Sequence, residues 1–241
     1  MNLSGKRFTS AKNIPAIIAF SLSAIISSSA SAAILINEVD YDQPGSDTAE
    51  FIELFNNGNS STSLDGYRID LINGSNSRVY RQIDLSGFTL QSKNYFVVCN
   101  DPSQVANCND VFTSSTGWIQ NGAPDALALY DNENNRIDSL AYEGTLSPFT
   151  ETAATNAKDS NTVITSLSRL PDGTDSNNNQ TDFNLGCLTP GTANIAGTGN
   201  CSTNKVSAVP LPAAIWLFAS GLLGLTGINR ARPYHSVNTS S

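Results

Sequence analysis

The sequence predicts an all-β protein built as a β-sandwich, and three observations lead to that prediction. Short runs alternate apolar and polar residues with a period of two, which is typical of half-buried strands. Gly, Asn, Asp, Ser or Pro bound each run, and these residues favour turns. We find no long amphipathic helix pattern and no internal repeat of fixed period. Several short strands separated by turns indicate two packed sheets.

Eight segments carry the strand pattern in chain order. They are residues 34–37, 50–55, 67–71, 79–85, 94–99, 125–130, 136–142 and 162–170. The segment DNENN at 131–135 separates two of them and predicts a hairpin turn. From residue 188 to 207 the chain is small and polar, which predicts the end of the domain and a spacer.

The N-terminal segment has the pattern of a secretory signal peptide. Basic residues precede an apolar run from Ile14 to Ile26, and small residues ending at Ala32 follow it. The run is shorter than the roughly 20 residues of a membrane-spanning helix. We therefore expect signal peptidase to remove residues 1–32, with an uncleaved anchor as the alternative.

A second apolar segment, VPLPAAIWLFASGLLGLTGINRAR, occupies residues 209–232. It is uncharged as far as Ile228, just long enough to cross a bilayer, and two arginines follow it, which favours a cytoplasmic end. Ser220 and Gly224 form a small-xxx-small pair that suits helix contact. We expect a transmembrane helix here, and a buried core helix is the alternative.

The same segment resembles the PEP-CTERM sorting signal of Gram-negative bacteria. The residues that carry this resemblance are Val209, Pro210, Leu211, Pro212, Ser220, Gly221, Gly224, Arg230 and Arg232. The resemblance implies recognition by an exosortase, a membrane enzyme that cleaves near the Pro motif and moves its substrate to the envelope or beyond. This chain departs from the pattern in its sparse basic end and in the further tail at 233–241.

Charge limits the partners of the region between the two apolar ends. Residues 33–212 hold all 21 Asp and Glu but only 8 of the 13 Lys and Arg, a formal charge of 8 minus 21, or minus 13. Such a surface repels nucleic acid, so we expect no nucleic-acid partner. The length of this region suits one domain with its own core.

All four cysteines lie in the region that we expect to be exported. An even count in an oxidising compartment predicts two disulfides. Four cysteines allow three connectivities, and proximity in sequence favours Cys99 with Cys108 and Cys187 with Cys201.

Three stretches together resemble the lamin-tail domain, an immunoglobulin-like β-sandwich. The first is ILINEVDYDQPGSDTAEFIELFNNG, which starts at Ile34, the second is residues 117–144, and the third is residues 166–194 with Ser168-Arg169 and Thr189-Pro190-Gly191. The resemblance implies the fold of residues 33–194, with 195–208 as a polar spacer, but it says little about activity.

An acidic run from Glu38 to Glu53 raises the alternative of an acid-residue hydrolase. Glu50 faces the side of its strand that carries Ile52 and Leu54, so a buried structural role is the favoured interpretation. Nucleophilic hydrolysis is disfavoured because His235 is the single histidine and no G-x-S-x-G occurs. We expect no catalytic residues and no enzyme activity.

The candidate metal site is a loop with oxygen ligands at alternating positions. These residues are Asp175, Asn177, Asn179 and Asp182. Oxygen-rich loops suit calcium, but the EF-hand Gly and Glu positions are absent, and a hydrogen-bonded turn explains the same pattern.

The leading hypothesis is a non-enzymatic exported protein, sorted to the cell envelope, surface or extracellular matrix, with a structural or binding role. Its expected partners are signal peptidase, an exosortase, the membrane, and an extracellular polysaccharide or protein. A calcium-dependent adhesion or carbohydrate-binding module is the first alternative.

Overall fold

The structure is a computed structural model that describes residue 1 and residues 34–197. Its strands and its single described helix follow in chain order: β1 (Ile34–Asp40), β2 (Phe51–Asn56), β3 (Thr62–Ser63), β4 (Arg68–Asn73), β5 (Arg78–Asp84), β6 (Thr89–Leu90), β7 (Tyr95–Cys99), β8 (Cys108–Val111), β9 (Asp125–Tyr130), β10 (Arg136–Tyr142), β11 (Ser166–Arg169), α1 (Asn179–Asp182) and β12 (Phe183–Gly186). The all-β prediction is confirmed for this part of the chain.

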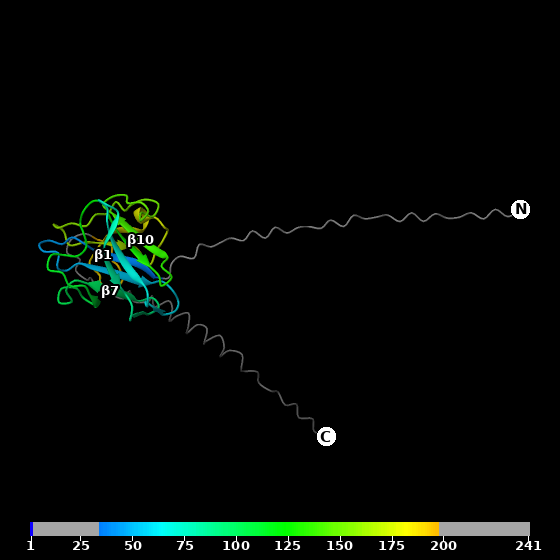
Figure 1. Ribbon diagram of the computed structural model, residues 1–241, viewed down its shortest axis with the longest axis horizontal. Helices are drawn as coiled ribbons and strands as arrows, with labels where there is room; N and C mark the ends of the chain where they lie inside the picture. Colours follow the sequence, from blue (N-terminus) through cyan, green and yellow to red (C-terminus); the bar gives the residue numbers. More distant parts are fainter. Residues whose placement is uncertain (2–33, 198–241) are drawn as a thin grey trace, which may run out of the picture.

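Two sheets pack against each other, and Figure 1 shows them as one body. The larger sheet has the order β12-β11-β1-β2-β7-β8, and the smaller has the order β10-β9-β4-β5. Neighbouring strands run antiparallel except β7 and β8, which run parallel. The short strands β3 and β6 form a separate two-stranded sheet. This arrangement is consistent with an immunoglobulin-like sandwich.

The main core lies between the inner faces of the two sheets. Ile52 and Leu54 contribute from the six-stranded sheet, and Leu71, Leu127 and Leu140 contribute from the four-stranded sheet. These side chains alternate with residues of the opposite face, as the period-two pattern predicts. Burial of this apolar surface is the main stabilising term of the sandwich.

A β-bulge in β1 changes which side chains face this core. The register with β2 shifts between Ile36 and Glu38, so that Ile36 pairs with Leu54 but Glu38 pairs with Glu53. An extra residue in one strand reverses the facing of everything after it. Val39 therefore joins the core, and Glu38 turns to the outer face.

Loops cover both outer faces. On the six-stranded sheet, Phe51, Val97 and Cys99 pack with Val105 from the following loop and with Leu188. On the four-stranded sheet, Ile72 and three alanines pack with Leu146 and Phe149 from the loop after β10. The strands β1 and β2 are buried over their whole length, whereas β5 and β8 remain largely exposed.

Several strand boundaries differ from the sequence prediction. The segment at 162–170 is a strand only from Ser166 to Arg169, because Thr165 is part of a loop held by Asp159. The strands β3, β6, β8 and β12 escaped prediction because each has only two to four residues. The predicted turn at 131–135 is confirmed, since the Asp131 amide bonds the Asn135 carbonyl.

The segment after β12 belongs to the folded domain. The Cys187 amide bonds the Ile195 carbonyl at 2.8 Å, and Gly186 forms a bridge with Ala196. Ordered contacts thus continue two residues past the expected boundary at 194. Residues 187–196 are named the closing segment below.

The predicted signal peptide, sorting segment and tail lie outside the described residues, apart from Met1. Within residues 34–197, no helix has the length and apolar character needed to cross a bilayer.

Candidate functional site

Glu53 lies in β2 and Glu50 directly precedes it, and the two side chains point to opposite faces of the six-stranded sheet. Glu50 reaches into the core, where one carboxylate oxygen accepts from the amides of Trp118 and Ile119, the latter at 3.2 Å. Glu53 faces the closing segment and accepts from Asn37 Nδ2 at 2.8 Å and from the Gly191 amide at 2.6 Å. The two carboxylates therefore do not form a pair across a sugar-binding cleft.

Burial raises the pKa of both glutamates, to about 8 for Glu50 and about 9 for Glu53. The hydrogen bonds that each accepts lower the pKa but do not offset burial. Both side chains are fully buried. The burial and hydrogen bonding expected for them are confirmed, because each supplies acceptors to peptide or amide N–H groups in the interior.

Glu38 and Asp172 complete the set that holds the closing segment. Glu38 accepts from the Thr189 amide at 3.0 Å and from its hydroxyl at 2.8 Å. Asp172 accepts from the Asn194 amide at 3.1 Å and from Tyr95 Oη at 3.0 Å. Together with Glu53 they fix three points along the closing segment. We name Glu38, Glu53 and Asp172 the acidic clamp.

Asp40 and Asp159 form a buried carboxyl pair near the end of β1. Asp159 accepts from the amides of Tyr41, Asp42 and Ser160 and from the Thr165 hydroxyl. Burial, followed by the charge of Asp159, raises the pKa of Asp40 well above its usual range. Asp40 is therefore the member of the pair that holds a proton more readily, and its Oδ2 is buried without a hydrogen bond to another described group, which suits a proton shared with Asp159.

Arg169 joins the two sheets at one end of the sandwich. Its guanidinium bonds Asp138 of β10 at 2.8 Å and Asp182 of α1 at 3.1 Å, and it lies 4.4 Å from the Phe183 ring centroid. Its Nε donates to the Ile36 carbonyl at 2.8 Å. Burial disfavours the charge, but the surrounding carboxylates raise the pKa of Arg169. We name this group the arginine cluster.

The predicted calcium ligands do not all converge. Carboxylate oxygens of Asp175, Asp182 and Glu151 lie within 4.8 Å of one another, so an acidic group exists here. Asn179 points inward instead, accepting from the Ala141 amide and donating to the Ser139 carbonyl. The cation that contacts Asp175 and Asp182 is Arg169, at 3.7 and 3.1 Å. Calcium at this loop stays a prediction.

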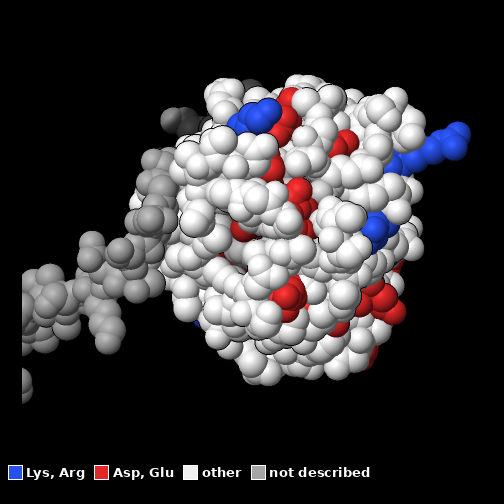
Figure 2. Space-filling view, turned by 90° about the vertical axis from the view of Figure 1, so that its left-hand side faces the viewer, with Lys and Arg blue, Asp and Glu red and all other residues white. Residues whose placement is uncertain are grey.

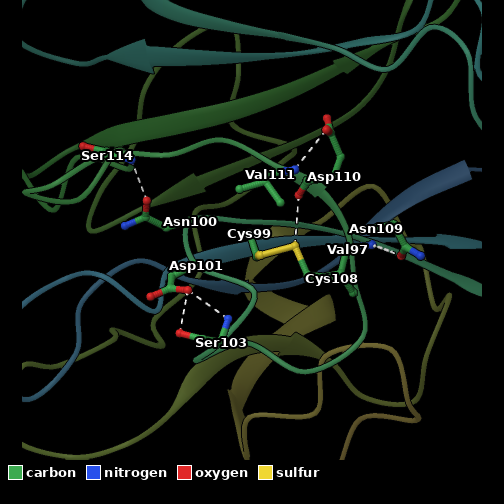
Figure 3. The surroundings of a disulfide bond; sticks show 10 residues. All are labelled: Val97, Cys99, Asn100, Asp101, Ser103, Cys108, Asn109, Asp110, Val111 and Ser114. Atoms are coloured by element: carbon green, nitrogen blue, oxygen red, sulfur yellow. Dashed lines mark hydrogen bonds between the residues drawn. A yellow bond between two sulfur atoms is a disulfide. The ribbon is translucent and has the colours of Figure 1, made fainter.

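The disulfide between Cys99 and Cys108 is confirmed, with a Cα–Cα distance of 5.7 Å (Figure 3). It closes the loop that covers Phe51 and Val97 on the outer face. Within this loop, Asp101 accepts from the Ser103 amide and hydroxyl, which forms an Asx turn. Cys201 lies outside the described residues, so its pairing with Cys187 stays a prediction.

Most of the surface consists of uncharged residues, and acidic residues outnumber basic ones among the rest. Figure 2 shows red acidic side chains dispersed across one face among white atoms, with only a few blue basic groups. Exposed aspartates at turns accept hydrogen bonds from neighbouring backbone, as Asp131 does from the amides of Glu133 and Asn135. These acidic side chains stabilise turns and do not converge on a pocket.

Three surface hollows differ in their chemistry. A cleft of about 580 Å³ lies between the turn after β10 and residues 152–158. A polar hollow of about 300 Å³ surrounds residues 120–125. An apolar groove of about 230 Å³ lies beside Val105 and Leu188, next to the disulfide loop. The first has the size of a small-ligand site.

Reasoning from the sequence missed several residues of these networks. Arg169 belongs to the stretch that resembles the lamin-tail domain and Asp182 is a candidate calcium ligand, but Asp138, which bonds Arg169, lies 31 positions away from it along the chain. Asp159 and Asp172 lie in segments without strand periodicity, so no pattern indicated that they are buried or bonded to β1 and to the closing segment. The Asp-rich composition gave no signal that could separate them from surface turns.

The family model of the Lamin Tail Domain matches residues 27–144. That match includes the β1–β2 pair with the bulge and the β9–β10 hairpin, and it stops before β11 and the closing segment. A comparison with curated proteins finds no match. Over residues 27–144 the chain is thus similar to the lamin tail domain, and the all-β sandwich is the architecture that this similarity implies.

Proposed function

We propose that this chain is a non-enzymatic exported protein whose sandwich is a structural or binding module at the cell envelope or in the extracellular matrix. The observation that carries the proposal is that the acidic residues which a hydrolase would need for catalysis are instead bonded to groups in the protein interior. Glu50 and Glu53 are fully buried, point to opposite faces and bind interior N–H groups. This geometry favours a module that presents a rigid surface over one that performs acid–base chemistry.

Export is supported by two features of different origin. The sequence has the pattern of a signal peptide at 1–32, and the confirmed disulfide suits an oxidising compartment. The sorting pattern at 209–232 adds a route: signal peptidase releases the N-terminus, the apolar segment halts in the membrane, and an exosortase cleaves near Pro210 and Pro212. The acidic domain is the cargo, and nucleic acid is not its partner.

Intact mass of the protein from membrane and extracellular fractions of its native host tests this proposal. A species that starts near Ala33 and ends near residue 212 supports export and sorting. A species that keeps residues 213–241 means a stable anchor and overturns sorting. A species that starts at Met1 overturns cleavage by signal peptidase, and its absence from both the membrane and the extracellular fraction overturns export. Replacing Pro210 and Pro212 by Ala should block processing, whereas P233A, a proline outside the motif, should be processed as the wild type is.

A calcium-dependent adhesion module is the second candidate, and the oxygen group of Asp175, Asp182 and Glu151 favours it. Calcium would have to share these carboxylates with the buried Arg169 guanidinium. Melting of the purified chain with millimolar calcium, compared with magnesium and with D175N, tests it. A rise in melting temperature that is specific for calcium and absent from D175N supports the site. If the melting temperature does not rise, the calcium candidate is excluded.

A further inference from the structure

The largest of the three hollows lies between two segments that cover the edge of the sandwich near β10. It is lined by Glu143, Gly144 and Thr145, by residues 152–158, and by Gln180 of α1. Its volume of about 580 Å³ lies within the roughly 300–1,000 Å³ of small-molecule sites. We name it the loop cleft.

Four polar side chains of the loop cleft form no hydrogen bond with any described residue. They are Thr145, Thr152, Asn156 and Gln180. Their neighbour Thr155 differs, because its hydroxyl donates to the Phe183 carbonyl at 3.0 Å and accepts from the Ala157 amide. The hydroxyl and amide groups that remain can both donate and accept. The cleft thus offers hydrogen bonding of both kinds to an outside molecule.

The charged residues of the loop cleft are paired with each other. Lys158 Nζ bonds one oxygen of Glu143 at 2.8 Å, and Tyr41 Oη donates to the other oxygen at 3.2 Å. Tyr41 in turn accepts from the Asp159 amide, so the Glu143 carboxylate has a fixed orientation. The lining carries no net charge, while the domain around it is acidic. A neutral ligand suits this site, whereas the negative field of the domain repels an anionic ligand.

Two residues of the lining hold a backbone conformation that side chains disfavour. Glu143 has φ 56° and Thr152 has φ 50°, and a β-branched residue at positive φ is an outlier. Such conformations persist where the surrounding structure fixes them, and they gather at binding sites. The two positions lie in the two segments that line the cleft, the turn after β10 and residues 152–158.

We propose that the loop cleft binds a neutral carbohydrate. A sugar presents hydroxyl groups that both donate and accept, which matches the four uncommitted side chains and the oriented Glu143–Lys158 pair. Its C–H faces suit the methyl groups of Ala153, Ala154 and Ala157, which also line the cleft. The inference deepens the proposed binding role by naming a ligand class, and it does not depend on the route of export.

A glycan array tests the ligand class with the full-length chain purified in detergent. The array carries neutral oligosaccharides beside sulfated and uronic-acid glycans, and ligand-observed NMR then titrates the best neutral disaccharide. We expect retention of neutral glycans and a dissociation constant of about 1 mM, weak because no aromatic ring lines the cleft. N156A and Q180A should each weaken binding by roughly 3- to 10-fold through loss of a hydrogen bond. Both positions are on the domain surface and should preserve folding.

The matched controls are N59A and Q91A, which remove exposed amide side chains far from the lining residues in sequence and outside the cleft. Both should bind the disaccharide as the wild type does. The proposal is overturned if neutral glycans are not retained, if only anionic glycans bind, or if N156A and Q180A behave as the controls do. If the array is negative while intact mass shows processing, the ligand class fails and the export proposal stands.

Discussion

The two faces of the six-stranded sheet are both buried, but different partners bury them. The inner face meets a second sheet, and apolar side chains such as Ile52 and Leu54 suffice there. Much of the outer face meets the backbone of the closing segment, whose N–H groups need acceptors. Glu38 and Glu53 supply those acceptors. A face that is covered by a loop thus requires polar residues where a face that is covered by a sheet requires apolar ones.

Each face also has exceptions to this division, and they follow the same rule. On the inner side, Arg169 and Glu50 lie where backbone groups of Ile36 and Trp118 would otherwise lack partners. On the outer side, Phe51, Val97 and Cys99 are apolar where the disulfide loop covers them with Val105. Whether a buried side chain is polar or apolar thus depends on whether backbone polar groups or apolar side chains pack over it.

The largest effect should come from breaking the arginine cluster on the inner side. R169M leaves the buried carboxylates Asp138 and Asp182 without their cation, so we expect a loss of about 3–5 kcal/mol in the free energy of unfolding. Urea denaturation measures it, and R78M, an exposed arginine of β5, should stay within about 0.5 kcal/mol of the wild type. If the purified R169M chain does not fold, the companion D138N should still show a loss larger than that of R78M. Equal stability of R169M and R78M would contradict a bridging role for Arg169.

The acidic clamp on the outer side should give the next effect. E53L keeps the size of the side chain but leaves the Gly191 amide and one Asn37 donor without an acceptor, which should cost about 2–3 kcal/mol. Hydrogen exchange should then show faster opening of the closing segment than of β9. The control is E133L in the exposed hairpin turn, where we expect no such change. A stable E53L chain with protected closing-segment amides would refute the clamp.

The buried Glu50 on the inner side should make the stability of the domain depend on pH. Its folded pKa of about 8 is raised above the ordinary 4.5, so its contribution to stability is complete below pH 4.5 and is lost as pH rises through 8. E50Q keeps the acceptor oxygen and cannot ionise. It should match the wild type at pH 4 within about 0.5 kcal/mol and exceed it at pH 9 by about 4–5 kcal/mol, because stability falls by about 1.4 kcal/mol per pH unit between the two pKa values. Thermal melts at both pH values measure this difference. E133Q should follow the wild type, and an E50Q chain that also follows it at pH 9 would contradict burial of a neutral Glu50.

The smallest effect should come from Asp40, because its protonated side chain already acts as a donor to Asp159. D40N replaces that O–H donor with an N–H donor and keeps the oxygen that accepts from Gln43, so stability at pH 7 should change by less than about 0.5 kcal/mol. D159N is the contrasting variant, since its NH2 group must face either the Tyr41 amide or the Ser160 amide, which bond different oxygens of Asp159, and it should cost about 1–3 kcal/mol. Chemical denaturation compares the two. Equal losses would show that the proton is not on Asp40.

Much of the fold could be predicted because alternation is a local signal. Segments 125–130 and 136–142 coincide with β9 and β10. The turn rich in Asp and Asn between them was sufficient to predict the hairpin. The pairing of Cys99 with Cys108 followed from proximity along the chain. The short strands β8 and β12 carry too few residues for a period to appear, and pairing with β7 and β11 creates them.

The candidate sites were less predictable, because long-range contacts define them. The loop that resembled a calcium site is occupied in part by Arg169, and Asn179 turns to β10. The loop cleft combines the turn after β10, a segment without periodicity and a residue of α1. Its composition of Thr, Ala and Asn is that of an ordinary surface loop, so no local pattern separates it from a turn.

The sequence by itself determined the all-β class, the order of the main strands, the acidic charge and one disulfide, since each depends on composition or on residues close along the chain. The tertiary structure alone decided which carboxylates are buried and what they hold. The bulge in β1 moves Glu38 to the outer face, and only the approach of the closing segment supplies the N–H groups that make its burial favourable. A buried charge or acid is stable only beside its partners, and those partners come from distant segments.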